Sequence, residues 1–146
     1  MNPHALFAIC NFGILPAWLL LAVAPSWRGT QWIVHAAVLP VLLALVYGFA
    51  LFSAPAAPDG AGFGSLAGVM LLFTVPEAVL AGWVHYLVFD LFVGAWEVRD
   101  ARRRGIPHLW VLPCLVLTLM LGPLGLLLYL VLRWVRTRTL LLEETS

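Results

Sequence analysis

The chain has 146 residues, of which 63% are hydrophobic and 10% are charged, and its mean hydropathy is +1.00. This composition excludes a soluble domain and indicates an integral membrane protein, while a net charge of +1 argues against nucleic acid as a partner. All basic residues are arginine, so a retinal Schiff base, a pyridoxal phosphate linkage and a lysine nucleophile are also excluded.

Four stretches approach the roughly 20 apolar residues that a membrane-spanning helix needs. They cover residues 6–24, 32–52, 75–98 and 108–134. At this length the chain has no room for separate soluble and membrane modules. We therefore predict one all-α, multi-pass membrane domain over residues 1–146, a bundle of four spans with a short interfacial or re-entrant segment at 65–73.

The first apolar run ends in Ala22-Val23-Ala24, which resembles a signal-peptidase site. No lysine or arginine precedes the run, so we interpret it as a permanent helix rather than a cleaved leader. Residues 53–64 (SAPAAPDGAGFG) are rich in proline, glycine and alanine, which predicts a loop before the short segment at 65–73.

The third span has a recognisable beginning and end. Thr74 is predicted as its N-cap, with Pro76 in the first turn and Glu77 at the position that a capping box requires. The helix is expected to continue beyond the membrane through the charged residues 97–104, and Gly105 is expected to end it.

The last span is interrupted by Gly122-Pro123-Leu124-Gly125, which weakens or kinks a helix. Arginines at 99–104 and at 133–138 flank this span, and both groups favour the cytoplasmic side. With four crossings they fall on opposite sides. The conflict disappears if the break turns the span into a re-entrant hairpin, an alternative that the sequence leaves open.

Two ionisable groups, His85 and Asp90, lie inside the third span. Ionisable side chains are expensive in hydrocarbon and indicate function. On a helical projection Asp90 shares one stripe with Trp83, Tyr86 and Glu97, whereas His85 lies about 140 degrees away. They therefore form no direct pair within the helix. A structural role, a carboxylate held by another span, remains open for Asp90, as does a packing role for His85.

Other polar groups in the apolar runs are candidates for a shared cleft. Asn11 and His35 each precede a proline that loosens its helix, although an interhelical hydrogen bond or contact with headgroups explains them equally well. Glu77 is interpreted mainly as a cap. Cys10 and Cys114 are interpreted as packing thiols, because they lie far apart and form no CxxC pattern.

Several strings in the chain match a known pattern. They are Asn11 with LPAW at 15–18, APSW at 24–27, WVHYLVFDLFVG at 83–94, GIPH at 105–108, LPC at 112–114 and LTLMLGPLGLLLY at 117–129. In these strings the chain resembles the abscisic-acid-deficient-four-like family of membrane proteins, over residues 11–129.

Plant members of this family are associated with neoxanthin formation, in which a xanthophyll epoxide becomes an allene, and with carotenoid isomerisation. The resemblance therefore implies a carotenoid or retinoid polyene as substrate. No plastid transit peptide is recognisable, so a bacterial inner membrane is expected. Epoxide opening needs an acid and a base, and we assign Asp90 as the acid and His85 as the base.

The substrate is expected to enter from the bilayer and to lie against aromatic residues of the third span. The residues expected to bind it are Asn11, His35, Glu77, Trp83, Tyr86, Phe89, Phe92 and Trp96. Simple cis–trans isomerisation, which needs only a shaped cleft and transient protonation of the polyene, is an alternative that the sequence does not separate from epoxide opening.

Non-isomerase alternatives remain. A carotenoid carrier or assembly factor explains the aromatic lining without turnover. The second alternative is a haem protein in which His35 and His85 are the two iron ligands. Apart from this alternative, no cofactor and no metal are predicted. Expected partners are the lipophilic polyene and membrane lipid, together with a second copy of the chain, because small bundles bury polar faces by self-association.

Overall fold

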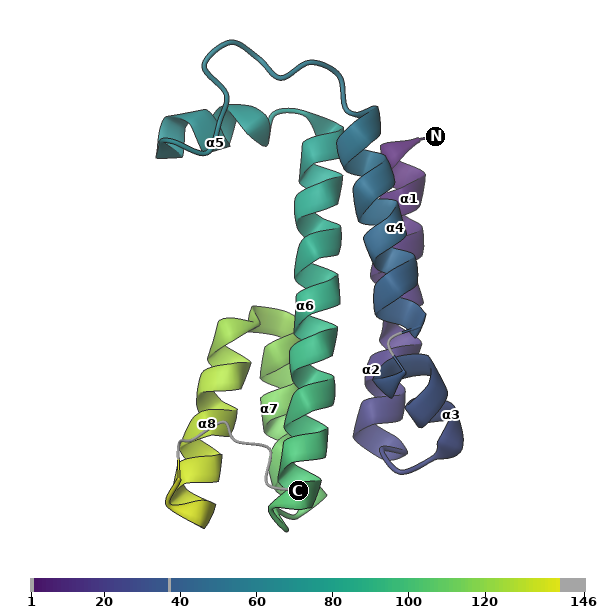
Figure 1. Ribbon diagram of the computed structural model, residues 1–146, viewed down its shortest axis with the longest axis vertical. Coiled ribbons are helices and arrows are strands. Elements are labelled where there is room, and N and C mark those ends of the chain that lie inside the picture. The colour runs from purple at the N-terminus through teal and green to yellow at the C-terminus, as the bar shows by residue number, and fades with distance from the viewer. Residues whose placement is uncertain (1, 37, 140–146) are drawn as a thin grey trace.

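The computed structural model describes residues 2–36 and 38–139, and the regular secondary structure in this part of the chain is helical (Figure 1). The elements are α1 (Pro3–Gly13), α2 (Leu15–Val23), α3 (Arg28–Thr30), a π-helical turn η1 (Gln31–His35), α4 (Val38–Ser53), α5 (Leu66–Leu72), α6 (Pro76–Arg103), α7 (His108–Leu121) and α8 (Pro123–Thr137). The all-α membrane fold is thus confirmed.

Three stretches are long and apolar enough to cross a membrane: Pro3–Val23, Arg28–Ser53 and Pro76–Arg103. They correspond to the first three predicted spans. The first is divided at Ile14 into α1 and α2, because Pro16 has no amide hydrogen to continue the helical ladder. Many apolar side chains on these stretches face outward, as lipid contact requires.

The predicted fourth span over 108–134 is not one continuous helix. α7 and α8 form a hairpin whose turn lies beside the middle of α6 (Figure 1). Gly122 adopts φ +46°, a conformation that suits glycine, and Pro123 starts α8 in a new direction. α7 has 14 residues, about 21 Å of helix, which is shorter than a bilayer core of about 30 Å. The hairpin has the shape that the re-entrant alternative requires.

The predicted capping box at the start of α6 is also wrong. Val75 is the N-cap and its side chain makes no capping hydrogen bond. The Thr74 hydroxyl instead donates to the carbonyl of Leu71, 2.7 Å away, in the preceding turn. The other end agrees with the sequence: α6 continues to Arg103, and Gly105 follows with φ +65°.

The short segment at 65–73 forms α5, which lies crosswise to α6 at the end where α6 begins (Figure 1). Ser65 caps it by accepting a hydrogen bond from the Gly68 amide at 3.0 Å. Leu66 and Met70 are 78% and 65% exposed, respectively. A short helix with this orientation and exposed apolar residues fits the predicted interfacial placement.

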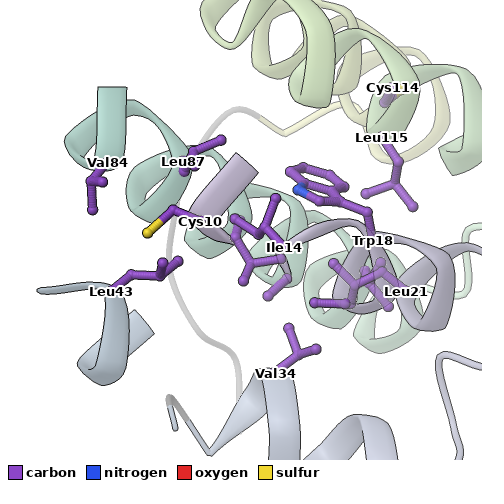
Figure 2. Close-up of a cluster of buried hydrophobic side chains, with 14 of the residues drawn as sticks. Cys10, Ile14, Trp18, Leu21, Val34, Leu43, Val84, Leu87, Cys114 and Leu115 are labelled. Carbon is purple, nitrogen blue, oxygen red and sulfur yellow. The ribbon is translucent and has the colours of Figure 1, made fainter. Parts of the chain in front are cut away.

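The core lies where α1, α2, α4 and α7 surround α6. Figure 2 shows Ile14, Trp18 and Leu21 between the side chains of α6 and those of the neighbouring helices. Trp18 packs directly on Gly94, where an added Cβ would come within 2.7 Å of the indole ring. Gly94 therefore allows α2 to approach α6 closely.

The arginines gather at one end of the molecule. Arg28 begins α3, residues 99–104 end α6, and residues 133–138 end α8, and these three regions lie together opposite the N-terminus and α5 (Figure 1). The hairpin thereby removes the conflict between the two arginine groups. By the positive-inside rule, the arginine-rich end is expected to face the cytoplasm.

Candidate functional site

Asp90 lies at the middle of α6, against the turn of the α7–α8 hairpin. The residue is 9% exposed, and its Oδ2 atom has no hydrogen-bond partner among the described residues. A Cβ added at Gly122 would come within 2.9 Å of Asp90 Oδ1, so the backbone of the turn passes directly over the carboxyl group. The structure thus buries this predicted catalytic residue without satisfying all its hydrogen bonds.

The hairpin turn also affects the charge of the Asp90 environment. Gly122 is the N-cap of α8, and no side chain caps this helix start. A helix N-terminus carries a partial positive charge and stabilises an anion nearby. Burial, in contrast, stabilises the neutral form of a carboxyl group. The two effects oppose each other at Asp90.

Three predicted substrate-binding residues lie together on one side of Asp90. A groove of about 270 Å³, which we call the Asn11 groove, is lined by Asn11, Trp83 and Tyr86 together with Leu119 and Met120 of α7. Its polar groups are bonded to protein. The Trp83 indole donates to Asn11 Oδ1 at 3.1 Å, and the Tyr86 hydroxyl donates to the Leu119 carbonyl at 3.0 Å.

Two other predicted residues lie on another side of α6. Phe92 and Trp96 line a groove of about 290 Å³ with Leu126 and Leu130 of α8, which we call the Trp96 groove. Asp90 lies on α6 between the residues that line the two grooves. The predicted aromatic set is therefore divided between two grooves instead of forming one cleft.

His85 lies on a face of α6 that turns away from the hairpin. Its ring is exposed and lies 4.5 Å from the ring of Phe89 and 6.1 Å from that of Tyr47 on α4, measured between ring centroids. Neither Phe89 nor Tyr47 lines either groove. The structure does not bring His85 and Asp90 together as an acid–base pair.

His35 lies far from His85. Its Nδ1 atom is 2.9 Å from a guanidinium nitrogen of Arg99, so Nδ1 accepts the hydrogen bond. Arg99 follows His85 by fourteen residues, about 21 Å along the axis of α6. The two histidines thus lie at different depths and do not meet around one iron. Among the described residues, no group of three histidine, cysteine or acidic side chains is arranged to hold a metal ion.

Glu77 lies near the opposite end of α6 from the arginines. It lines a small pocket of about 150 Å³ with Phe49 and Ser53 of α4 and Pro3 of α1. This position is about 20 Å from Asp90 along the helix axis, thirteen residues away. The structure therefore separates Glu77 from the groups around Asp90.

Sequence reasoning missed Glu97 as a candidate, although it placed Glu97 on the stripe of Asp90. Glu97 has no exposed surface. Its Oε1 atom accepts a hydrogen bond from the Thr118 hydroxyl of α7 at 3.0 Å, and its Oε2 atom has no hydrogen-bond partner within the described part of the chain. The shared stripe was the signal, and the charged residues that follow Glu97 obscured it.

A second buried cluster was also missed, at the arginine-rich end. Asp100 accepts from the Tyr129 hydroxyl at 2.6 Å and from Arg104 Nε at 2.9 Å, and Arg133 Nε lies 3.4 Å from the same carboxylate. Arg133 is fully buried. No sequence pattern pointed to this role, because arginines beyond a span usually serve as solvated anchors.

Comparisons with known proteins identify a family. No curated protein and no solved structure matches the chain. A family model described as ABA DEFICIENT 4-like matches residues 5–129, a region that contains Asp90, Glu97, both grooves and the hairpin. Since this match covers most of the sequence, the chain belongs to the ABA DEFICIENT 4-like family of membrane proteins.

Proposed function

We propose that the protein is a membrane-embedded isomerase of a carotenoid or retinoid polyene, in a bacterial inner membrane, with Asp90 as the proton donor. Family membership makes the chain a carotenoid-related membrane protein. The observation that carries the finer proposal is the buried Asp90 carboxyl group with its unpaired Oδ2 atom, which lies on α6 between the residues that line the Asn11 groove and those that line the Trp96 groove.

The environment of Asp90 favours reversible proton transfer. Burial favours the neutral acid, whereas the start of α8 stabilises the carboxylate that remains after proton loss. A group whose two protonation states are both stabilised can give up a proton and take it back at modest cost. A purely structural carboxylate in hydrocarbon is instead expected to have all its acceptor sites filled.

The grooves suit a long apolar ligand. The Trp96 groove is lined by apolar and aromatic side chains, and the Asn11 groove adds a few polar groups at one wall. Phe92 is 56% exposed and Trp83 is 37% exposed, so both aromatic surfaces are accessible from the bilayer. A polyene dissolved in lipid reaches such grooves sideways without crossing water.

The proposed chemistry needs one proton. Protonated Asp90 donates to a carbon of the conjugated chain, which forms a delocalised carbocation and leaves the carboxylate. Bond order falls along the conjugated system, so rotation becomes possible about a bond that was double. The carbocation then returns the same proton to Asp90, and the product is an isomer of equal mass.

Of the two isomerisation reactions, the conversion of an epoxide to an allene is the less well supported. It needs a base that removes a carbon-bound proton while the acid protonates the epoxide oxygen. The residue assigned to that task from sequence, His85, faces α4 and lipid instead of the Asp90 side of α6. The position of His85 therefore favours cis–trans isomerisation, for which the Asp90 carboxyl group alone suffices.

Replacement of Asp90 by asparagine tests this proposal. Cells that make a carotenoid or retinoid precursor would express the wild type or Asp90→Asn, and their lipid extracts would be compared by chromatography and mass spectrometry. The wild type should shift the precursor to an isomer of equal mass. Asp90→Asn should convert it at least about a hundredfold more slowly, the usual loss for a general acid.

Two further variants make the result interpretable. His85→Ala should retain activity if one carboxyl group suffices, and loss of activity in it would favour the epoxide mechanism. Asp59→Asn, in the exposed loop before α5, is the matched control for loss of a carboxylate. Full activity in a folded Asp90→Asn protein contradicts the acid role, and a coloured wild type without turnover indicates a carrier.

A further inference from the structure

Glu97 and Asp90 carry buried oxygen atoms that the described residues leave without hydrogen bonds. Glu97 is fully buried and Asp90 is 9% exposed, and both belong to the face of α6 that the hairpin covers. Unpaired carboxyl oxygens at membrane depth are expensive, and where they occur they often mark proton or ion pathways. The proposed isomerisation uses Asp90 but gives Glu97 no task.

The indole of Trp18, which carries another unpaired polar atom, packs on α6 between the positions of the two carboxyl groups. Glu97 follows Asp90 by two helical turns, about 10 Å along the axis. Gly94 lies between them on α6, and the Trp18 indole packs on it. Trp18 is 5% exposed, and its Nε1 atom has no hydrogen-bond partner among the described residues. Buried water is the usual partner of polar atoms in such positions.

The other neighbours of Glu97 connect it to the arginine-rich end. Thr118 of α7 donates to its Oε1 atom, and Asp100 lies three residues further along α6. Asp100 is bonded to Tyr129 of α8 and to Arg104, whose side chain is 14% exposed and so reaches the surface. The elements packed here also carry Cys114 and His108 on α7 and Arg133 and Arg136 on α8, of which His108 contacts the Ala22 carbonyl and Arg136 lies over the Trp110 ring.

We propose that Glu97 is a proton-transfer residue that connects Asp90 with water at the arginine-rich end of the molecule. Protonated Glu97 passes a proton through water to the Asp90 carboxylate. Glu97 then takes up a proton from the aqueous phase beside Arg104 and Asp100, so that the net change is the transfer of one proton from this aqueous phase to Asp90. The isomerisation returns its own proton to Asp90, and the path through Glu97 supplies the proton that Asp90 must carry before the first turnover. The inference rests on the proposed function only because that function gives protonated Asp90 a task. The proton path itself operates without conversion of a substrate.

Glu97 is a positioning residue for the chemistry, because it acts through Asp90 and touches no substrate. The path has a direction that the fold imposes. Toward the start of α6 from Asp90, the next polar side chains belong to the Asn11 groove and are bonded to protein, whereas toward the arginine-rich end the same face carries Glu97 with its unpaired Oε2 atom and then Asp100. The protonation state of Asp90 should therefore follow the pH at the arginine-rich end and not the pH at the end that carries α5.

The test measures protonation of Asp90 directly. The full chain is placed in sealed phosphatidylcholine–phosphatidylglycerol vesicles with one known orientation, and the pH is changed on one side at a time. The infrared carbonyl band of protonated Asp90 is assigned as the band that Asp90→Asn removes. In the wild type this band should respond to a pH change on the arginine-rich side.

Glu97→Gln keeps the shape of the side chain and an acceptor for Thr118, but it cannot carry a proton. It should slow the response of the Asp90 band about a hundredfold, the lower range for loss of a proton-transfer group. Glu97→Asp should restore most of the rate. Thr118→Val keeps the carboxyl group of Glu97 but removes the hydroxyl that donates to it, and it should also slow the response. This variant replaces Glu97→Gln in the test if Glu97→Gln does not fold.

Asp59→Asn is the matched control, because it removes a carboxyl group from the exposed loop before α5, at the opposite end of the molecule. It should leave the response unchanged. An unaltered rate in Glu97→Gln, or a response to the opposite side, overturns the proposed path. The two proposals can also fail separately. If the band response depends on Glu97 but Asp90→Asn still produces the isomer at the wild-type rate, the proton path is supported and the proposed function is rejected.

Discussion

At the scale of single residues, the site depends on how closely the backbone of the hairpin approaches Asp90. Two features of Gly122 require a residue without a side chain. Its φ of +46° is a conformation that favours glycine, and an added Cβ would lie only 2.9 Å from Asp90 Oδ1. Any side chain at Gly122 must displace the carboxyl group or change the turn. The position of Asp90 is therefore determined jointly by α6 and by this glycine.

Gly122→Ala should lower the free energy of unfolding by about 1–3 kcal/mol, because it adds backbone strain and a contact with Asp90. Thermal unfolding in detergent, followed by circular dichroism, measures the change.

The control is Gly48→Ala in α4, where an added Cβ meets nothing within 4 Å. It should be neutral or stabilising by up to about 1 kcal/mol, because alanine favours helix more than glycine does. Equal stability of the two variants contradicts the proposed close approach at Gly122.

At the scale of elements, the α7–α8 hairpin is held to α6 by polar contacts as well as by apolar packing. Thr118 joins α7 to Glu97, and Tyr129 and Arg133 join α8 to Asp100. Within the hairpin, an added Cβ at Gly125 would collide with the Thr118 backbone nitrogen, so α7 and α8 pack almost backbone to backbone.

Asp100→Asn should destabilise the hairpin strongly. It leaves buried Arg133 without its carboxylate partner, and breaking a buried ion pair in this way costs about 3–5 kcal/mol. Limited proteolysis at residues 104–108 and thermal unfolding in detergent measure the loss.

Asp59→Asn lies in the exposed loop and should change stability by no more than about 0.5 kcal/mol. If Asp100→Asn unfolds at the same temperature as this control, Asp100 does not anchor α8.

At the scale of the whole molecule, the hairpin turns a chain with four apolar runs into three spans and a partial one. The arginines then share one end, and α5 with the loop before it occupies the other (Figure 1). In this arrangement the middle of α6, beside the hairpin turn, supplies residues to both grooves. The site exists because the last apolar run folds back on itself beside α6.

Cysteine labelling distinguishes this topology from four crossings. Arg102→Cys and Arg138→Cys should both react with a membrane-impermeant thiol reagent from the cytoplasmic side, because both ends of the hairpin lie there. Asp59→Cys should react from the opposite side. Native Cys10 and Cys114 are buried and provide the background. Labelling of the 102 and 138 positions from opposite sides would contradict the hairpin.

Much of the fold follows from the sequence alone. Apolar runs of about 20 residues locate the first three spans, and glycine and proline locate the loop at 53–64, the end of α6 and the break at 122–125. The sequence also placed Asp90 and Glu97 on one stripe, since helical periodicity fixes which residues share a face. These features depend on local composition and spacing, and the sequence contains both.

Only the tertiary structure decided what the break at Gly122 does and which polar groups meet. A glycine–proline pair is compatible with a kink or a reversal, and the contacts of α8 with α6 select the reversal. The separation of His85 from Asp90, the burial of Glu97 and the pairing of Arg133 with Asp100 also depend on packing between distant segments. Spacing along one helix sets the direction of a side chain, but its partners come from other helices.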